Sequence, residues 1–263
     1  MPRVEGVTYG APCWMDLSSS DIGKARAFYG ELFGWTMTDT GPEFGNYNIV
    51  SKGDADIAGM AGKMPGMEGV PDAWTVYLAV PDVAETAAKV RAADGQVMFD
   101  VMQIGDQGSM TVIADPSGAV VGLWQPDKRQ GFELNNEAGA PCWFELLSRD
   151  FAAATAFYGT VLGIEIGDMP GDPGDEGPAY QVILVDGEPL AGIMDAAEGI
   201  LPEGVPSHWN VYWGVDDTDA AVAKAEDLGG SVLAPAADTP FGRFALLADP
   251  TGAAFAVISV GDA

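Results

Sequence analysis

The sequence contains very little histidine, cysteine and positive charge. Its 263 residues include 1 His, 2 Cys and 12 Lys or Arg against 39 Asp or Glu, which gives a formal net charge of −27. One imidazole excludes sites that need two from one chain, such as the two-His–one-carboxylate iron centre. Two cysteines exclude a four-cysteine zinc site. We expect no nucleic-acid partner, because a phosphate backbone attracts basic proteins.

The apolar content is sufficient for a packed core. Hydrophobic residues make up 48% of the chain and aromatic residues 10%, more than a disordered chain carries. No run approaches the roughly 18 apolar residues of a membrane helix, and the first residues lack the apolar stretch of a secretory signal. We therefore expect a cytoplasmic globular protein with reduced cysteines and no membrane partner.

The chain repeats itself. Ala-Pro-Cys-Trp at 11–14 returns at 140–143, and Asp-Pro-Ser-Gly at 115–118 returns as Asp-Pro-Thr-Gly at 249–252. The repeat is far longer than that of a solenoid protein, which indicates two homologous domains. We place the first domain at 1–125, a linker at 126–138 and the second domain at 139–263.

Each half divides again into a strand, a helix and further strands. Residues 13–17 read as a short strand, Asp21 begins a helix that Gly34 ends, and the pattern restarts with a strand at 74–80 and a helix after Asp82. The second half predicts helices at about 150–162 and 217–228. Other strands of the first half are expected near 44–50, 56–61, 96–101, 109–114 and 119–124. The predicted fold class is α+β, built from four βαβββ modules.

Two segments carry a family signature. DLSSSDIGKARAFYGELFGW at 16–35 and LLSRDFAAATAFYGTVLGI at 146–164 resemble the D-x-x-x-A-x-x-F-Y-x-x-x-x-G pattern of the vicinal oxygen chelate superfamily. That superfamily includes glyoxalase, bleomycin-resistance and extradiol-dioxygenase proteins. The resemblance implies tandem glyoxalase/bleomycin-resistance-like domains whose strands curl into open cups. More closely, the chain is similar to two-domain glyoxalase- or hydroxylase-like proteins of high-GC bacteria, some associated with aromatic polyketide pathways.

The resemblance also implies where metal-binding members of the superfamily carry their ligands. Three such places in each half hold Trp14, Thr75 and Gly122, and Trp143, Asn210 and Ala256. None of these side chains is a usual ligand of a transition metal. We therefore expect neither a metal nor another cofactor, and a metal-dependent glyoxalase-type lyase is the least supported function.

Alternation along the strands predicts which side chains face each cup. The first cup should hold Trp14, Asp16, Thr75 and Tyr77, and the second Trp143, Glu145, Asn210 and Tyr212. Met60, near the rim of the first cup, and His208, just before the strand of Asn210, are further expected ligand contacts. An aromatic wall with few polar groups suits a flat, hydrophobic aromatic small molecule.

Asp16 and Glu145 are the candidate catalytic residues, because a carboxylate in a poorly hydrated cup has its pKa raised towards a useful acid–base range. Two functions stay open. The first is metal-independent binding of a flat aromatic or polyketide-like compound, in natural-product biosynthesis or self-resistance. The second is a cofactor-free enzyme of cyclase or oxygenase type with one of these carboxylates as base.

A third interpretation is that these side chains only fill cups without a function. The sequence also leaves open whether the domains pair within one chain or across a homodimer, and whether the acidic loop 169–177 binds a cation.

Overall fold

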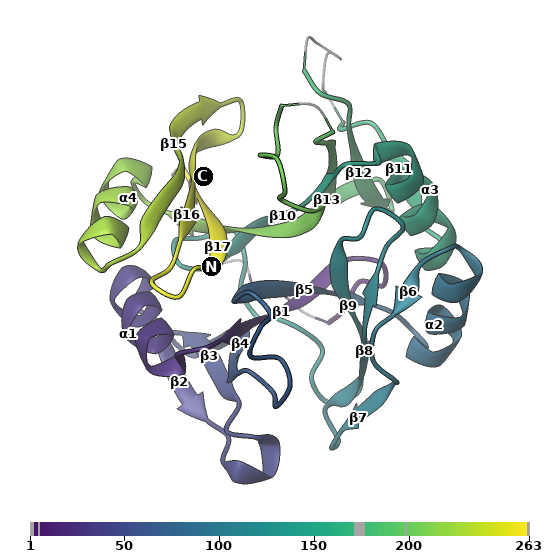
Figure 1. Ribbon diagram of the computed structural model, residues 1–263, viewed down its shortest axis with the longest axis horizontal. Helices are drawn as coiled ribbons and strands as arrows, with labels where there is room; N and C mark the ends of the chain where they lie inside the picture. Colours follow the sequence, from purple (N-terminus) through teal and green to yellow (C-terminus); the bar gives the residue numbers. More distant parts are fainter. Residues whose placement is uncertain (1–2, 5, 171–176, 198, 262–263) are drawn as a thin grey trace.

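The computed structural model describes residues 3–4, 6–170, 177–197 and 199–261, which form two curved sheets with the same strand order (Figure 1). The first sheet runs β2-β3-β4-β1-β5-β9-β8-β6, with β7 paired to β8, and the second runs β11-β12-β13-β10-β14-β17-β16-β15. Each domain carries two helices. The predicted pair of α+β domains of the glyoxalase type is confirmed. Most of the loop at 169–177 lies outside the described residues.

The elements of the first domain are β1 (Pro12–Ser19), α1 (Ile22–Phe33), β2 (Thr36–Asp39), the 3₁₀ turn η1 (Pro42–Phe44), β3 (Asn48–Lys52), β4 (Ala55–Gly62), β5 (Ala73–Ala79), α2 (Val83–Ala92), β6 (Gln96–Val97), β7 (Met102–Ile104), β8 (Gly108–Ala114) and β9 (Val120–Pro126). Those of the second domain are β10 (Pro141–Ser148), α3 (Phe151–Leu162), β11 (Glu165–Gly167), β12 (Tyr180–Val185), β13 (Glu188–Asp195), β14 (His208–Val215), α4 (Thr218–Asp227), β15 (Ser231–Thr239), β16 (Gly242–Ala248) and β17 (Ala254–Ser259).

The helices begin where the sequence predicts, and α1 and α3 also end there. Each follows an aspartate whose carboxylate accepts a hydrogen bond from the backbone N–H three residues later, namely Asp21, Asp82, Asp150 and Asp217. Gly34 and Gly163 end α1 and α3 with φ of 71° and 67°, a left-handed conformation that glycine adopts at little cost.

The strands of the first domain differ from the prediction in two places. The expected strand at 44–50 begins only at Asn48, because Pro42 starts the 3₁₀ turn that contains Phe44. The expected strand at 96–101 ends at Val97, and β2 and β7 are short, largely exposed strands without a clear alternation. Short exposed strands leave little apolar pattern to read.

The two sheets pack back to back through one core. α1 lies beside α4, and α2 beside α3 (Figure 1). Between the sheets, the ring centroid of Trp213 lies 4.7 Å from that of Trp35 and 5.2 Å from that of Trp74. Tyr158 of α3 donates a hydrogen bond to Asp115 in the β8–β9 turn at 3.1 Å. Signature residues thus join the two domains, and the concave faces point away from this core.

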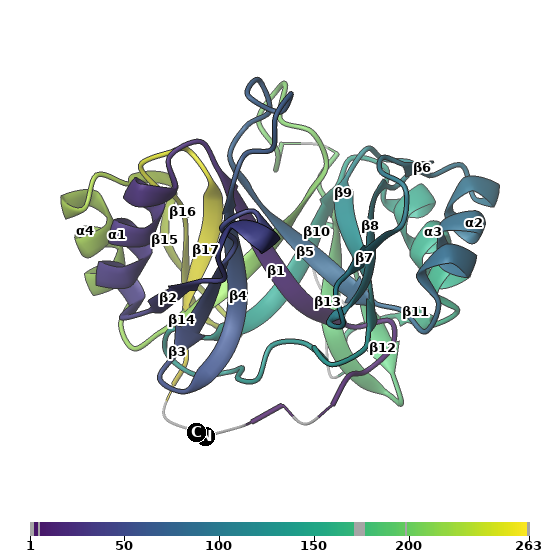
Figure 2. The same cartoon turned by 90° about the horizontal axis from the view of Figure 1, so that it is seen from below.

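The linker runs beneath both sheets, along the same edge as the N-terminal arm (Figure 2). Its Glu133 carbonyl accepts a hydrogen bond from the Val4 N–H at 3.1 Å, and Arg3 forms a β-bridge with Leu134. In the part of the chain that the structure describes, we find no helix long and apolar enough to cross a bilayer.

Candidate functional site

Each concave face presents one carboxylate at the middle of its central strand. In the first sheet, Asp16 of β1 pairs with Gly59 of β4 and Thr75 of β5. In the second, Glu145 of β10 pairs with Gly192 and Asn210 in the same register. We call these two concave faces the first cup and the second cup.

The first cup is built around Asp16. The indole Nε1–H of Trp14 lies 2.9 Å from the Asp16 carboxylate and 2.8 Å from the hydroxyl of Tyr47, and that hydroxyl also hydrogen-bonds to Asp16. Tyr77 pairs with Trp14 across the two strands. Its ring lies so close to Gly122 that a Cβ there would overlap the ring atoms. The four predicted side chains therefore share one face, and Trp14 and Tyr77 are buried.

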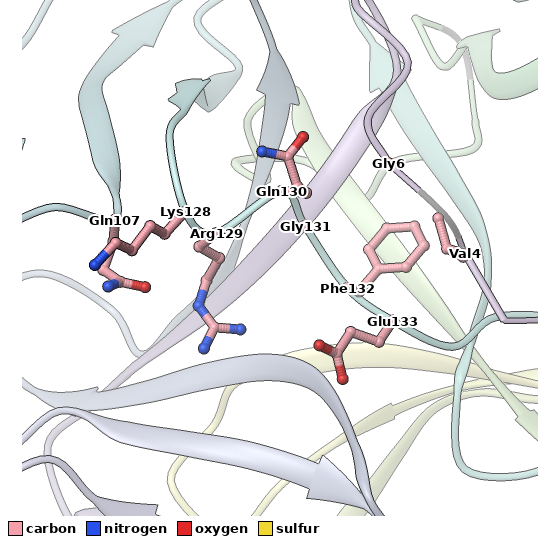
Figure 3. Close-up of a pocket in the computed structure, with 9 residues that line it drawn as sticks. All are labelled: Val4, Gly6, Gln107, Lys128, Arg129, Gln130, Gly131, Phe132 and Glu133. Atoms are coloured by element: carbon pink, nitrogen blue, oxygen red, sulfur yellow. The ribbon is translucent and has the colours of Figure 1, made fainter.

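The linker covers part of this cup. The guanidinium carbon of Arg129 lies 4.9 Å from the centre of the Trp14 ring, and its Nη2 is 3.0 Å from the Asp56 carboxylate. Arg129 and Glu133 extend from the linker towards the same strands, beside a pocket of about 250 Å³ (Figure 3). Phe44 of η1 lies near Gly105 in the β7–β8 turn, and the Gln107 carbonyl of this turn accepts a hydrogen bond from the Arg129 N–H at 3.1 Å.

The second cup repeats this cluster without a cation. The hydroxyl of Tyr212 donates to the Glu145 carboxylate at 2.6 Å, and the Trp143 Nε1–H donates to the Tyr180 hydroxyl at 3.1 Å. Glu145 is buried, whereas Trp143 and Tyr212 are half-buried. Among the described residues, no ion pair includes Glu145.

The wall beside Glu145 is apolar. Leu246 of β16 faces the cup because it pairs with Ala256, which in turn pairs with Tyr212. The ring of Phe244 lies 6.3 Å from that of Tyr212. Both Phe244 and Leu246 are half-buried, so this wall has apolar surface left to cover.

Burial raises the pKa of both carboxylic acids. Hydrogen bonds from Tyr47, Trp14 and Tyr77 and the charge of Arg129 partly offset this effect on the pKa of Asp16. Hydrogen bonds from Tyr212 and Tyr180 partly offset it for Glu145. Either group can therefore hold a proton closer to neutral pH than an exposed carboxylic acid does.

Tyr47 and Tyr180 belong to these clusters although the sequence reasoning did not select them. They occupy equivalent positions, since Ile49 pairs with Gly59 and Val182 pairs with Gly192. The recurrence of a tyrosine two residues before each of these positions is the signal that could have found them.

Of the two further predicted ligand contacts, Met60 lies away from its cup and His208 lies on the concave face of the second. Met60 is fully buried and pairs with Leu17, so it faces the core beneath α1; this corrects the expectation that it lines the first cup. One residue separates it from the cup-facing Gly59, and successive residues of a strand point to opposite faces. His208 lies on the concave face at the start of β14, paired with Leu147, with Nδ1 2.8 Å from the Pro206 carbonyl.

The side chains at the family's ligand places do not fit a transition metal. The indoles of Trp14 and Trp143 stand on the central strands, with Gly122 and Ala256 on β9 and β17, and none of these offers a ligand atom. Thr75 and Asn210 carry only a neutral hydroxyl and a neutral amide, whereas transition metals are bound mainly by imidazole and thiolate. Among the described residues, no group of three or more His, Cys, Asp or Glu could hold one.

Two cupped sheets with this strand order define a tandem glyoxalase-type protein. Residues 13–123 match the model of the glyoxalase/bleomycin resistance protein/dioxygenase superfamily, and residues 143–258 match that of a glyoxalase-like domain. The chain belongs to this superfamily.

Similar proteins come from actinobacteria. CFP32 of Mycobacterium tuberculosis, whose name assigns it provisionally to the glyoxylases, is 41% identical over 98% of both chains. The anthracycline biosynthesis proteins DauV of Streptomyces sp. strain C5 and DnrV of Streptomyces peucetius are each 36% identical. The two alignments cover 97% and 95% of this chain, respectively, and 94% of each relative.

Solved structures share the fold. The 2,3-dioxygenase LapB from Pseudomonas sp. KL28 aligns with a TM-score of 0.63 at 14% identity, over 98% of this chain and 93% of that one. The Mn(II)-bound glyoxalase from Novosphingobium aromaticivorans aligns with a TM-score of 0.61 at 16% identity, over 100% and 84%.

Proposed function

We propose that the second cup binds a flat aromatic compound of polyketide type, without a metal ion, in natural-product biosynthesis or self-resistance. The observation that carries this proposal is the arrangement around Glu145. A buried carboxyl group, two phenols and an indole stand beside a half-buried apolar wall. Aromatic and aliphatic walls bind flat rings, and a few polar groups fix their orientation.

Two further points support the ligand class. Glu145 has no cationic partner among the described residues and a raised pKa, so it can donate a hydrogen bond from its protonated form to a carbonyl or phenol oxygen. The relatives named as anthracycline biosynthesis proteins extend over nearly the whole chain, which supports a natural-product context.

The test compares the two cups by titration with 1,8-dihydroxyanthraquinone. Leu246→Asp places a charge in the second cup, and Val112→Asp places the same charge at the equivalent half-buried position of the first. We expect Leu246→Asp to weaken binding by about tenfold or more and Val112→Asp to leave it within about twofold, since a charge against a flat apolar ring is poorly solvated.

Addition of a chelator should leave the affinity unchanged. Absence of saturable binding, or loss of binding on chelation, would contradict the proposal. A larger effect of Val112→Asp than of Leu246→Asp would move the site to the first cup.

The second candidate is a cofactor-free enzyme acting on such a compound. The raised pKa of Asp16 and Glu145 favours it, because a carboxylate of raised pKa is a stronger base towards an acidic carbon or phenol. Glu145→Gln or Asp16→Asn would then remove turnover and leave affinity within a few-fold. Recovery of the compound unchanged after incubation with the native protein would exclude this candidate for that compound.

A further inference from the structure

The two central parallel strand pairs each diverge at one end. β1 pairs with β4 from Asp16 onward, and β10 pairs with β13 from Glu145 onward. Before these positions the strands separate, so a wedge opens between 12–14 and 56 in the first domain, and between 141–144 and 189–190 in the second. By the register of these pairs, Asp56 is equivalent to Pro189, and Trp14 is equivalent to Trp143.

In the first domain the linker fills the wedge. The N–H of Phe132 donates to the Cys13 carbonyl at 2.8 Å, and the N–H of Glu133 donates to the Asp56 carbonyl at 2.8 Å. The Asp56 N–H in turn donates to the Glu133 carboxylate at 3.0 Å. Arg129 then lies over the Trp14 ring. The first wedge is therefore closed by backbone hydrogen bonds and by a stacked guanidinium.

In the second domain the equivalent wedge is a pocket of about 220 Å³, which we call the linker pocket. Its apolar walls come from both domains and the linker and include Pro12, Phe132, Pro141, Trp143, Phe144 and Pro189. The rings of Phe132 and Phe144 stack with centroids 5.9 Å apart. Pro189 has no backbone N–H, so this wedge cannot repeat the bond that the Asp56 N–H donates to the Glu133 carboxylate in the first.

The chemistry of the walls selects a neutral occupant. All the lining side chains are uncharged, in a protein whose formal net charge is −27. Asn135 and Asn136 supply amide groups that donate or accept hydrogen bonds. The Cys142 thiol stays protonated, because burial raises its pKa to about 12. A cavity of about 150 Å³ with apolar walls admits benzene, so the larger linker pocket suits two fused rings.

We propose that the linker pocket binds a flat, uncharged two-ring aromatic compound against Trp143, in the place that Arg129 and the linker close in the first domain. The site lies where the ends of β10 and β13 diverge, rather than beside Glu145 inside the second cup. Binding there depends on the pocket walls and not on Glu145. This inference can therefore be tested separately from the proposed function.

The test uses 2-naphthol, which is neutral at pH 7, and 2-naphthoate, an anion of similar size. Isothermal titration of the full chain should show saturable binding of 2-naphthol and affinity for 2-naphthoate about tenfold weaker or worse, because the pocket offers no cation. Pro189→Asp recreates the carboxylate of the first domain at the pocket wall and should weaken 2-naphthol about tenfold.

Two variants of equal charge serve as controls. Pro240→Asp, in the exposed β15–β16 turn, should leave the affinity for 2-naphthol within about twofold, because a distant exposed charge is screened. Leu246→Asp, inside the second cup, is the variant that distinguishes binding in that cup from binding in the linker pocket. Circular dichroism checks that each variant is folded.

Each remaining outcome overturns the inference. Absence of saturable 2-naphthol binding does so directly, as does equal affinity for 2-naphthoate. If Leu246→Asp weakens 2-naphthol and Pro189→Asp does not, the compound lies in the second cup; that result contradicts the linker pocket and supports the proposed function.

Discussion

The two cups carry the same cluster but differ in how much of it their own chain covers. In the first cup, Trp14 and Tyr77 are 7% and 6% exposed, and Arg129 lies over the indole. In the second, Trp143 and Tyr212 are half-buried, and the residues that line the pocket beside Trp143 are neutral. In this duplicated fold the linker thus covers part of the first cup, whereas aromatic surface stays accessible in the second.

This difference supports the proposal that the second cup, and not the first, binds a ligand. A stacked guanidinium and an ion pair stabilise the first cup from within, which suits a structural role. Exposed aromatic surface beside a buried carboxyl group suits ligand binding. The first cup then serves as an internal reference, because each variant of the second cup has a matched position in the first.

Gly122→Ala should have the largest effect on stability. A Cβ at this position would overlap the body of the Tyr77 ring rather than its tip, so the ring must move within a buried cluster. We expect a loss of about 2–3 kcal/mol in the free energy of unfolding, as for other overpacked cores, measured by urea denaturation.

The second cup supplies the matched variant, because Ala256 stands where the first cup has Gly122. Ala256→Gly removes a methyl group and adds backbone freedom, which should cost about 1 kcal/mol. If Gly122→Ala loses no more unfolding free energy than Ala256→Gly, the Tyr77 ring moves aside at little cost and is not tightly held.

Much of this architecture was predictable from the sequence, since it depends on local patterns. The aspartates before each helix and the glycines after α1 and α3 act on residues a few positions away. The repeat then extends the same pattern to the second domain. Alternation placed Asp16 and Glu145 on the concave faces because a strand has a period of two.

The covering of the first cup was not predictable. Arg129 and Trp14 are far apart in the sequence, and neither carries a pattern that predicts their stacking. The prediction that Met60 contacts the ligand at the rim of the first cup was wrong by one position along the strand. A shift of one residue exchanges the two faces of a strand. Tyr47 was not selected although the expected strand at 44–50 includes it; in the structure it lies just before β3, which begins at Asn48.

The pH dependence of stability should also separate the cups. Burial raises the folded-state pKa of Glu145, so the folded protein keeps this proton at a pH where the unfolded chain has released it. Stability is therefore lost as the pH rises from the ordinary pKa of a glutamic acid to the raised value. Glu145→Gln removes this loss, and its stability relative to the native protein should increase over that window.

Asp16→Asn should show a smaller increase in stability relative to the native protein, over the pH window between the ordinary and the raised pKa of Asp16. Three hydrogen-bond donors and the charge of Arg129 oppose the effect of burial on the pKa of Asp16, whereas Glu145 has two donors and no cation. Urea denaturation at a series of pH values measures both. A steeper dependence for Asp16→Asn would show that Arg129 does not stabilise the ionised carboxylate.

Arg129→Ala should have a small effect on stability, but it bears most directly on the difference between the two cups. The cation–π contact and the half-buried ion pair with Asp56 predict a loss of about 1 kcal/mol. Lys128→Ala is the control, since its ion pair with Asp106 is exposed and should contribute less. The Arg129 variant should also make Trp14 more accessible to acrylamide quenching, as judged against the same variant with Trp14→Phe. Unchanged quenching would mean that the backbone of the linker, and not the guanidinium, closes the first cup.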